Sequence, residues 1–335
     1  MNVLMLYRPE IPSVRAQSLQ VLQTAGALAQ RQHRVTVLAR RGDSDPSVPN
    51  VPDNVQLKVS PYRHPTACGL WFRKELLLWW KQNRGVVIAR DKKKLAGIVS
   101  YLPKKHRILF EIHAVDSLLR PKKGWERIEQ KCASLSDVLI ANCDGTLQQW
   151  ERQYPNSAIK KGVIHNATSL SHTNARALSV IRCIGSLHPY KGFEQLRPIL
   201  PQIPYPLELI GPRHIDIEPH PKLTVSPAIP HEQVASKMAS AKALLLLLRD
   251  DLFGRHFTSP LKLWDYLSSS RPIIAPNLPT IREIAQHAQT DFCWYEPHNP
   301  SSLIGAIRKA CAQPARSPYI RTWLDRAEEL EAFFP

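Results

Sequence analysis

Residues 257–267, FTSPLKLWDYL, lie between the apolar runs ALLLLLR (243–249) and SRPIIAP (270–276). This order predicts a buried strand, a loop, a helix and a second buried strand, the repeating unit of a parallel α/β sheet. Ser259 and Pro260 are the expected helix start, because Ser is a favoured N-cap and Pro at the first helical position loses no hydrogen bond. The stretch therefore brings a helix start to the carboxyl end of a strand.

That helix start is a candidate anion site. The helix dipole favours a phosphate at the outward-facing amides of the first turn, which are those of Thr258, Ser259, Leu261 and Lys262. The Lys262 side chain adds a positive charge, and Asp265 lies one turn further on the same face. A phosphate site with a hydroxyl-binding acid behind it suits a nucleoside diphosphate. The alternative is an ordinary capped helix of the core.

The same alternation of apolar runs and helical stretches fills the first half of the chain. A helix is expected at 18–32, and the expected strands are 3–7, 33–40, 55–61, 85–90, 107–113, 137–143 and 163–167. Continuous apolar strands separated by helices indicate a parallel sheet that is covered on both faces. Residues 1–168 are therefore predicted to form a doubly wound domain.

A second series follows a polar linker at 169–178. Its expected strands are 180–186, 207–211, 223–227, 243–249, 272–276 and 292–296, with helices at 231–241 and 260–270. This pattern predicts a second doubly wound domain at 179–316, and a last helix within 317–335 that packs back across both. The predicted fold class is α/β, with two Rossmann-like domains facing across a cleft at the carboxyl ends of their strands.

Composition narrows the class of protein. The 335 residues, 43% of them hydrophobic, contain no apolar run near the about 18 residues of a membrane-spanning helix. The amino-terminal residues lack the pattern of a signal peptide, and the six cysteines are scattered without metal-ligand spacing. We therefore expect a cytoplasmic protein without structural zinc. Neither half carries a G-x-G-x-x-G fingerprint or a Walker phosphate loop.

Charge is concentrated in the first half. The formal net charge is +17, and residues 1–170 hold 27 Lys and Arg against 13 Asp and Glu, while the remainder holds 18 against 15. The first half should face an anionic partner, which could be a nucleic acid, an acidic membrane surface or a phosphate-bearing acceptor. A basic solvated face without a partner is the alternative.

A second phosphate-oriented element is IGSLHPYKGFEQL (184–196), which follows the first strand of the second domain. Gly185, Pro189 and Gly192 predict a tight loop before a helix, with Lys191 projecting from the loop. A lysine in a glycine-containing loop between strand and helix suits a pyrophosphate. An exposed loop lysine without a ligand is the alternative. Lys191 shares the carboxyl edge of the predicted sheet with Ser259 and Lys262.

These motifs resemble glycosyltransferase family 4, a group of two-domain retaining enzymes with the GT-B fold. The resemblance rests on HNAT after a strand, GSLHPYKGF, and SPLKLWDYLSSSRPIIAPNLP, and more loosely on SLQVLQTAGALAQRQHRVTVLAR, VVIARD and FEIHAVDS in the first half. It covers essentially the whole chain, and its motifs are specific in the second domain.

The resemblance implies roles for residues of the second domain. Lys191, Lys262 and the amides around Thr258 and Ser259 would hold the donor diphosphate, and Asp265, in place of the usual Glu, would bind the ribose. Donor choice would depend on contacts near Gly211 and Ile229. Two positions depart from the family: Phe257 stands where a sugar-binding Glu is frequent, and Ser186 stands where an Arg is frequent. The first departure leaves the donor sugar open.

In the first domain the resemblance implies that His113, at a strand end, contacts the donor sugar or phosphate as a catalytic residue. A structural histidine at a strand end is the alternative. Arg8, Arg15 and Arg90 are expected on the acceptor side, although a local ion pair between Arg90 and Asp91 would explain these two residues equally well. The glycines that the family often has in the first loop are absent.

The segment GLWFRKELLLWWKQNR (69–84) interleaves aromatic and basic residues. This mix is typical of a helix in a membrane interface. A core helix with a basic outer rim explains the pattern equally well, so both readings stay open.

The predicted function is a retaining, metal-independent glycosyltransferase that moves a sugar from a nucleotide-diphosphate sugar to a hydroxyl of a lipid-linked or phosphorylated glycan. Basic side chains at the diphosphate would take the place of a metal, so no metal and no cofactor are expected, and no nucleic acid. The expected location is the cytoplasm, peripherally on the inner face of the cell membrane. The alternatives are a catalytically silent nucleotide-sugar binder and a GT-B nucleotide-sugar epimerase.

Overall fold

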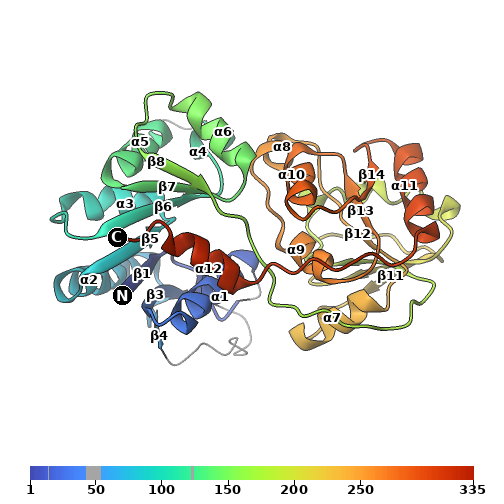
Figure 1. Ribbon diagram of the computed structural model, residues 1–335, viewed down its shortest axis with the longest axis horizontal. Coiled ribbons are helices and arrows are strands. Elements are labelled where there is room, and N and C mark those ends of the chain that lie inside the picture. The colour runs from blue at the N-terminus through green and yellow to red at the C-terminus, as the bar shows by residue number, and fades with distance from the viewer. Residues whose placement is uncertain (14, 43–53, 122–123) are drawn as a thin grey trace. The chain divides into compact units, whose positions relative to one another are not determined.

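The computed structural model describes residues 1–13, 15–42, 54–121 and 124–335, and the chain divides into two compact units (Figure 1). The first unit comprises Met1–Asn166 and Thr322–Pro335, and the second comprises Ala167–Arg321. The predicted linker, 169–178, belongs to the second unit, and the chain returns to the first unit for its last helix.

Among the described residues, the first unit contains an eight-stranded parallel sheet of order β2-β3-β1-β5-β6-β7-β8, with β4 paired to β3. The strands are β1 (Asn2–Leu6), β2 (Glu10–Ile11), β3 (Arg34–Arg41), β4 (Val55–Val59), β5 (Gly85–Ala89), β6 (Arg107–Ile112), β7 (Val138–Ala141) and β8 (Lys160–Val163). The helices are α1 (Ala16–Gln30), α2 (Pro65–Gln82), α3 (Lys92–Gly97), η1 (Val99–Tyr101), α4 (Asp116–Leu119), α5 (Trp125–Leu135), α6 (Asp144–Gln153) and α12 (Trp323–Glu331).

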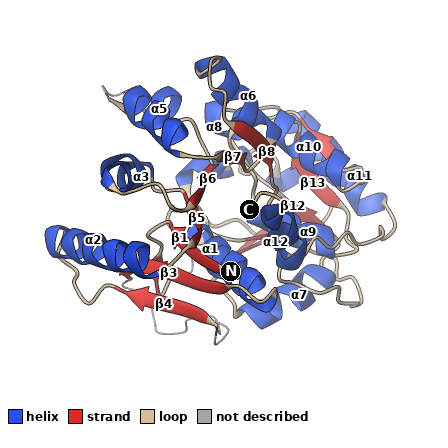
Figure 2. Ribbon diagram, turned by 60° about the vertical axis from the view of Figure 1, so that its left-hand side comes forward, coloured by secondary structure: helices blue, strands red, loops and turns tan. Residues whose placement is uncertain are grey.

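Helices cover both faces of this sheet. Figure 2 shows α2, α3 and α5 on one side of the strands, and α12 packs against α1 on the other. The central strands are mostly apolar because helices cover both faces, and Val3 to Leu6 of β1 have no exposed surface.

The second unit contains a six-stranded parallel sheet of order β11-β10-β9-β12-β13-β14. The strands are β9 (Ile181–Ile184), β10 (Leu207–Ile210), β11 (Leu223–Ser226), β12 (Ala243–Leu245), β13 (Ile273–Pro276) and β14 (Cys293–Tyr295). The helices are η2 (Pro189–Lys191), η3 (Phe193–Gln195), η4 (Leu200–Gln202), α7 (His231–Ala239), α8 (Leu252–His256), α9 (Leu261–Ser268), α10 (Pro279–His287) and α11 (Pro300–Ala312).

The run at 243–248 shows how this sheet organises its core. Leu245 and Leu247 belong to one apolar cluster, and Leu244, Leu246 and Leu248 belong to another on the opposite face. Strand order reverses between β9 and β12, and ligands of open parallel sheets bind beyond the strand ends at such a reversal. The predicted α/β class with two parallel sheets is confirmed.

Several predicted elements differ from the structure. The strand expected at 243–249 ends at Leu245. The strand expected at 163–167 is Lys160–Val163 instead, which pairs with β7 along its whole length. The helix expected after the loop at 184–192 is replaced by the short turns η3 and η4, because prolines at 198, 201, 204 and 206 interrupt any longer helix. The last helix begins at Trp323 rather than near 317, since Thr322 and Asp325 form a capping box there.

Candidate active site

Two lysines of the second unit converge on Gly185, the residue that follows β9. Gly185 has a φ of +127°, and a Cβ at this position would lie 3.5 Å from Cε and 3.7 Å from Nζ of Lys262. Lys191 reaches the same loop, where its Nζ donates a hydrogen bond of 3.0 Å to Ser186 Oγ. The sheet edge therefore brings together side chains 71 positions apart in the chain, as the parallel topology predicts.

Among the described residues, neither lysine of this pair has a carboxylate partner. Burial, together with the charge of Lys262, lowers the pKa of Lys191 to about 7. The Nζ atom of Lys262 is buried, and no acceptor in the described residues lies within hydrogen-bonding distance of it. A buried ammonium without a partner is unfavourable by several kcal/mol, so the pair is suited to an anion.

The helix α9 begins one residue later than predicted. Its N-cap is Pro260, which has an extended backbone with ψ of 122°, and its first residue is Leu261. The expected capping role of Ser259 is wrong, because its side chain accepts a 3.4 Å hydrogen bond from the indole of Trp264 instead. Thr258 and Ser259 are buried, and the amides of the first helical turn belong to Leu261 and Lys262.

Asp265 lies one turn beyond Lys262 on α9. Thr168 Oγ1 donates a 2.6 Å hydrogen bond to its carboxylate, and burial raises the pKa of Asp265 to about 6. Gly211, with a φ of +152°, follows β10, and a Cβ there would lie 2.3 Å from the carbonyl oxygen of Gly185. Only glycine allows these two strand ends to meet so closely. Ile229 packs at the edge of the core cluster that contains Leu263 and Trp264.

In the first unit, His113 follows β6 and is oriented by Glu111 of the same strand. His113 Nε2 bonds to Glu111 Oε1, and the imidazole is 16% exposed. Burial and the nearby charge of Arg90 lower the pKa of His113 to about 4, so the ring is neutral at physiological pH. A carboxylate can only accept, so Nε2 carries the proton and Nδ1 is an acceptor.

Glu111 is the centre of a buried polar cluster. Besides His113, it accepts hydrogen bonds from Tyr7 Oη, from Gln20 Nε2 at 3.0 Å and from Arg326 Nη2 at 3.0 Å. Burial alone would raise the pKa of Glu111, but the charge of Arg326 and the contact with His113 hold it well below its usual range. The carboxylate is therefore ionised at all physiological pH values.

The three arginines predicted on the acceptor side all have partners. Arg8 pairs with Asp91, and Arg15 pairs with Glu10 at 2.6 Å. Arg90 donates a 3.2 Å hydrogen bond to Gln20 Oε1, and burial lowers the pKa of its guanidinium. The local ion pair considered for Arg90 and Asp91 is wrong, because Asp91 is bound by Arg8.

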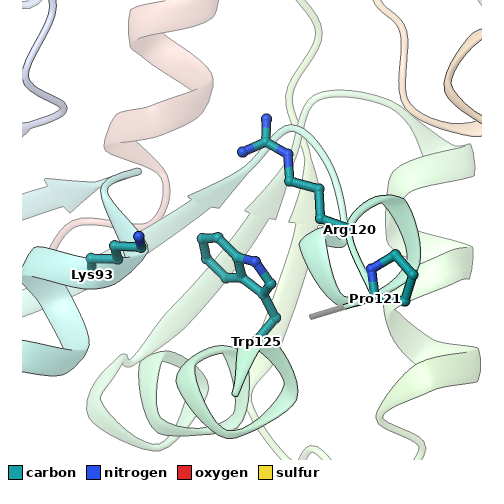
Figure 3. Close-up of a pocket in the computed structure, with 4 residues that line it drawn as sticks. All are labelled: Lys93, Arg120, Pro121 and Trp125. Carbon is teal, nitrogen blue, oxygen red and sulfur yellow. The ribbon is translucent and has the colours of Figure 1, made fainter. Parts of the chain in front are cut away.

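A pocket of about 580 Å³ opens in the first unit beyond β5 and β6, lined by Lys93, Arg120, Pro121 and Trp125. In Figure 3 the indole of Trp125 lies between the two cationic side chains, and Lys93 Nζ is 5.4 Å from its ring centroid. Lys92, the buried neighbour of Lys93, forms ion pairs with Asp116 at 2.8 Å and with Glu129. These pairs link α3 to α4 and α5. The pocket combines a flat aromatic face with two positive charges.

Comparison with known proteins gives the family. Residues 17–172 match the model of Glycosyltransferase Family 4. This part of the chain is a glycosyltransferase family 4 domain. A sequence search of curated proteins finds no match. The predicted family is confirmed.

Solved structures agree along the whole chain. The lipopolysaccharide outer core galactosyltransferase WaaB has 14% identity and a TM-score of 0.64, over 99% of this chain and 95% of that one. Anabaena Alr3699/HepE in complex with UDP and glucose has 15% identity and a TM-score of 0.66, over 98% of this chain and 94% of that one. WaaG, a glycosyltransferase involved in lipopolysaccharide biosynthesis, has 13% identity and a TM-score of 0.61, over 99% of this chain and 95% of that one. The fold is GT-B, and family and fold agree with the predicted enzyme class, a glycosyltransferase.

Phe257 and Ser186, the two positions that depart from the family 4 pattern, both have defined surroundings in the structure. Phe257 is 1% exposed and ends α8, with its ring 6.5 Å from that of Phe253. A buried aromatic ring therefore occupies the position at which the family often has a sugar-binding carboxylate. Ser186, in place of the frequent Arg, is the acceptor for Lys191.

Sequence reasoning about the family 4 motifs missed Glu111, Arg326 and Thr168. Glu111 had a usable signal, since a single acid inside the apolar run RILFEIH must find partners when the strand is buried. Arg326 had none, because an arginine in an amphipathic helix rich in charge looks like a solvated side chain. Thr168 became visible only through its contact with Asp265.

Within the described ranges, no three His, Cys, Asp or Glu side chains are grouped so that they could hold a metal ion. None of the described helices combines the length and apolar character needed to cross a membrane.

Proposed function

We propose that the chain is a retaining glycosyltransferase that transfers a hexose from a nucleoside-diphosphate sugar to a hydroxyl of its acceptor. The observation that carries this proposal is the lysine pair at Gly185, with Lys262 Nζ buried and without an acceptor among the described residues. A diphosphate supplies the missing negative charge. The amides of Leu261 and Lys262 at the start of α9 add to its stabilisation.

In the proposed reaction, the bond between the anomeric carbon and the terminal phosphate oxygen breaks, and its electron pair stays on that oxygen. The acceptor oxygen forms the new bond on the same face of the sugar, and its proton passes to the departing phosphate. Negative charge on the leaving diphosphate grows in the transition state, so Lys191 and Lys262 stabilise that state more than the ground state. This role needs no metal ion.

We propose a uridine nucleotide sugar as the donor. Two structures of the same fold were solved with such ligands. One is HepE with UDP and glucose, and the other is described as trehalose-6-phosphate from E. coli bound with UDP-2-fluoro glucose, with 11% identity and a TM-score of 0.64. Asp265 is the proposed partner of the ribose hydroxyls. Gly211 and Ile229 would lie near the base.

The acceptor is proposed to be a phosphorylated or lipid-linked glycan. The pocket of Lys93, Arg120 and Trp125 supports this choice, because an indole stacks on the apolar face of a sugar while the two cations bind a phosphate. Its place beyond the carboxyl ends of β5 and β6 is on the same sheet edge as His113. Arg8, Arg15 and Arg90 are less suited to this role, since each already has a partner.

A peripheral position on the inner face of the cell membrane is proposed for the same unit. The aromatic residues Phe72, Trp79 and Trp80 of α2 are buried, which favours a core helix. Its outer face nevertheless exposes Leu70 by 64% and Leu78 by 38%, with basic side chains between them. Such a face suits the headgroup region of an anionic bilayer. Sedimentation with phosphatidylglycerol vesicles tests it, and Leu70→Ser with Leu78→Ser should reduce the bound fraction.

Phe257 supports one rival, a nucleotide-sugar binder without activity, because the buried ring leaves no carboxylate at that position. Turnover of UDP-glucose separates the two. The wild type should release UDP, and Lys191→Ala should reduce that rate about 100-fold. Binding of UDP-glucose by the wild type without any release of UDP, in the presence of phosphorylated glycan acceptors, would favour the silent binder.

A further inference from the structure

The C-terminal helix α12 contributes a charged side chain to the polar cluster at the end of β6. Arg326 is 1% exposed, and its guanidinium donates to Glu111 Oε1 at 3.0 Å, to the carbonyl oxygen of Ile164 at 2.9 Å and to that of His165 at 3.0 Å. Three segments far apart in the sequence are joined by this one group. The contact with Glu111 spans 215 positions of the chain.

We propose that Glu111 and Arg326 are positioning residues for His113, which hold its ring with Nε2–H on Glu111 and leave Nδ1 as the acceptor for a substrate hydroxyl. The C-terminal helix is then part of the active site and not only a cover for α1. This inference rests on the proposed function and on the contact of His113 with the donor that the family resemblance implies.

Electrostatics of the cluster support the assignment. Among the described residues, the charged groups that act on His113 are Glu111 on its own strand, Arg90 after β5 and Arg326 from α12. Tyr7, after β1, binds Glu111. Two guanidinium groups oppose protonation of the imidazole, and one carboxylate favours it. Arg326 therefore has two effects, since it compensates the buried charge of Glu111 and adds to burial and to Arg90 in lowering the pKa of His113.

A purely structural ion pair is the competing explanation. Replacing both members of a buried pair by neutral groups is often nearly neutral for stability, whereas removing one member leaves a buried charge alone. The double variant Glu111→Gln/Arg326→Met therefore tests function with the least damage to the fold. Arg31→Met is the matched control, because Arg31 also anchors α12, through two 2.7 Å hydrogen bonds to Glu331, but does not touch Glu111.

The first measurement is an NMR titration of ¹³C,¹⁵N-labelled histidine, with His113 assigned from the spectrum of His113→Asn. In the wild type and in Arg31→Met, His113 should stay neutral from pH 8 to pH 5.5, with its proton on Nε2. Arg326→Met should move the titration midpoint of His113 upward, because one of the two guanidinium charges that oppose protonation of the ring is lost. The double variant should lose the preference for one tautomer. This readout needs no turnover, so it can succeed or fail independently of the proposed function.

The second measurement is the rate of UDP release from UDP-glucose at pH 8. The double variant should lower kcat about 10- to 100-fold with little change in KM, while Arg31→Met stays near the wild-type rate. The proposal is overturned if the double variant keeps the wild-type tautomer and rate, or if Arg31→Met shifts the titration of His113 as much as Arg326→Met does.

Discussion

The two units present opposite electrostatic arrangements at the carboxyl ends of their strands. In the first unit, Arg90 and Arg326, which act on His113, are bound by Gln20 and Glu111, and Arg8 is paired with Asp91. In the second, Lys262 has a buried ammonium without an acceptor among the described residues. The arginines near His113 are therefore bound to acceptors in the folded chain, whereas the ammonium of Lys262 is not bound to any acceptor among the described residues.

This difference indicates which edge changes when a ligand binds. A compensated network keeps its geometry with or without a ligand, and therefore suits the orientation of a substrate group. An uncompensated pair of lysines makes the free protein less stable and gains most from a bound anion. The four predictions below test this contrast, from the largest expected effect to the smallest.

The largest effect is expected for Lys262→Met. Affinity for UDP, measured by calorimetry, should fall about 100-fold, because a charged hydrogen-bond donor to the diphosphate is lost. At the same time the melting temperature of the free protein should rise, since a buried ammonium is replaced by an apolar chain. The exposed Lys309 of α11 supplies the control variant Lys309→Met, which should change neither value. A lower melting temperature for Lys262→Met would contradict the uncompensated charge.

The pH dependence of UDP binding should be the next largest effect. Since the pKa of Lys191 is lowered to about 7, the free protein loses this charge above pH 7, and affinity for UDP should fall by up to about tenfold per unit between pH 7.5 and 9. The unfolded chain binds more protons than the folded one between pH 7 and 10.5, so the stability contribution of Lys191 rises with pH in this window.

Lys191→Met supplies the control for this titration. Its UDP affinity should be lower at pH 7.5 and should vary little up to pH 9. An equally steep decline in the variant would assign the pH dependence to another group.

An intermediate effect is expected for Asp265→Asn. If the carboxylate on α9 binds the ribose, affinity for UDP should fall about tenfold while affinity for inorganic pyrophosphate is unchanged. Competition assays with the two ligands measure both values. Equal losses for UDP and pyrophosphate would mean that Asp265 shapes the diphosphate site rather than the nucleoside site.

The smallest effect is expected for Arg15→Ala in the first unit. The side chain of Arg15 is 71% exposed and pairs with Glu10, and exposed ion pairs contribute about 0–1 kcal/mol. The rate of UDP release should stay within about twofold of the wild type, and the melting temperature should barely change. A large loss of activity with phosphorylated acceptors would return Arg15 to the acceptor site.

The positions of the strands along the chain were largely predictable from the sequence, and the detailed course of the loops was not. The apolar runs ALLLLLR and GVVIAR each contain a buried strand, although the first strand covers only Ala243–Leu245 of the seven residues expected. The helix start at Ser259 was displaced by one residue, because its side chain binds Trp264, a contact between neighbours in the fold that no capping preference reveals. The end of β8 was displaced for a similar reason, since its pairing with β7 sets the register.

For the site, the sequence by itself determined Lys191, Lys262 and Asp265 as neighbours of one sheet edge, because parallel topology brings all strand ends together. Only the tertiary structure decided which charges are compensated. Burial, the 3.0 Å contact between Arg326 and Glu111, and the missing acceptor of Lys262 among the described residues depend on packing between segments up to 215 positions apart. Residue types predict where charges can gather, whereas the cost of each charge depends on the groups that surround it after folding.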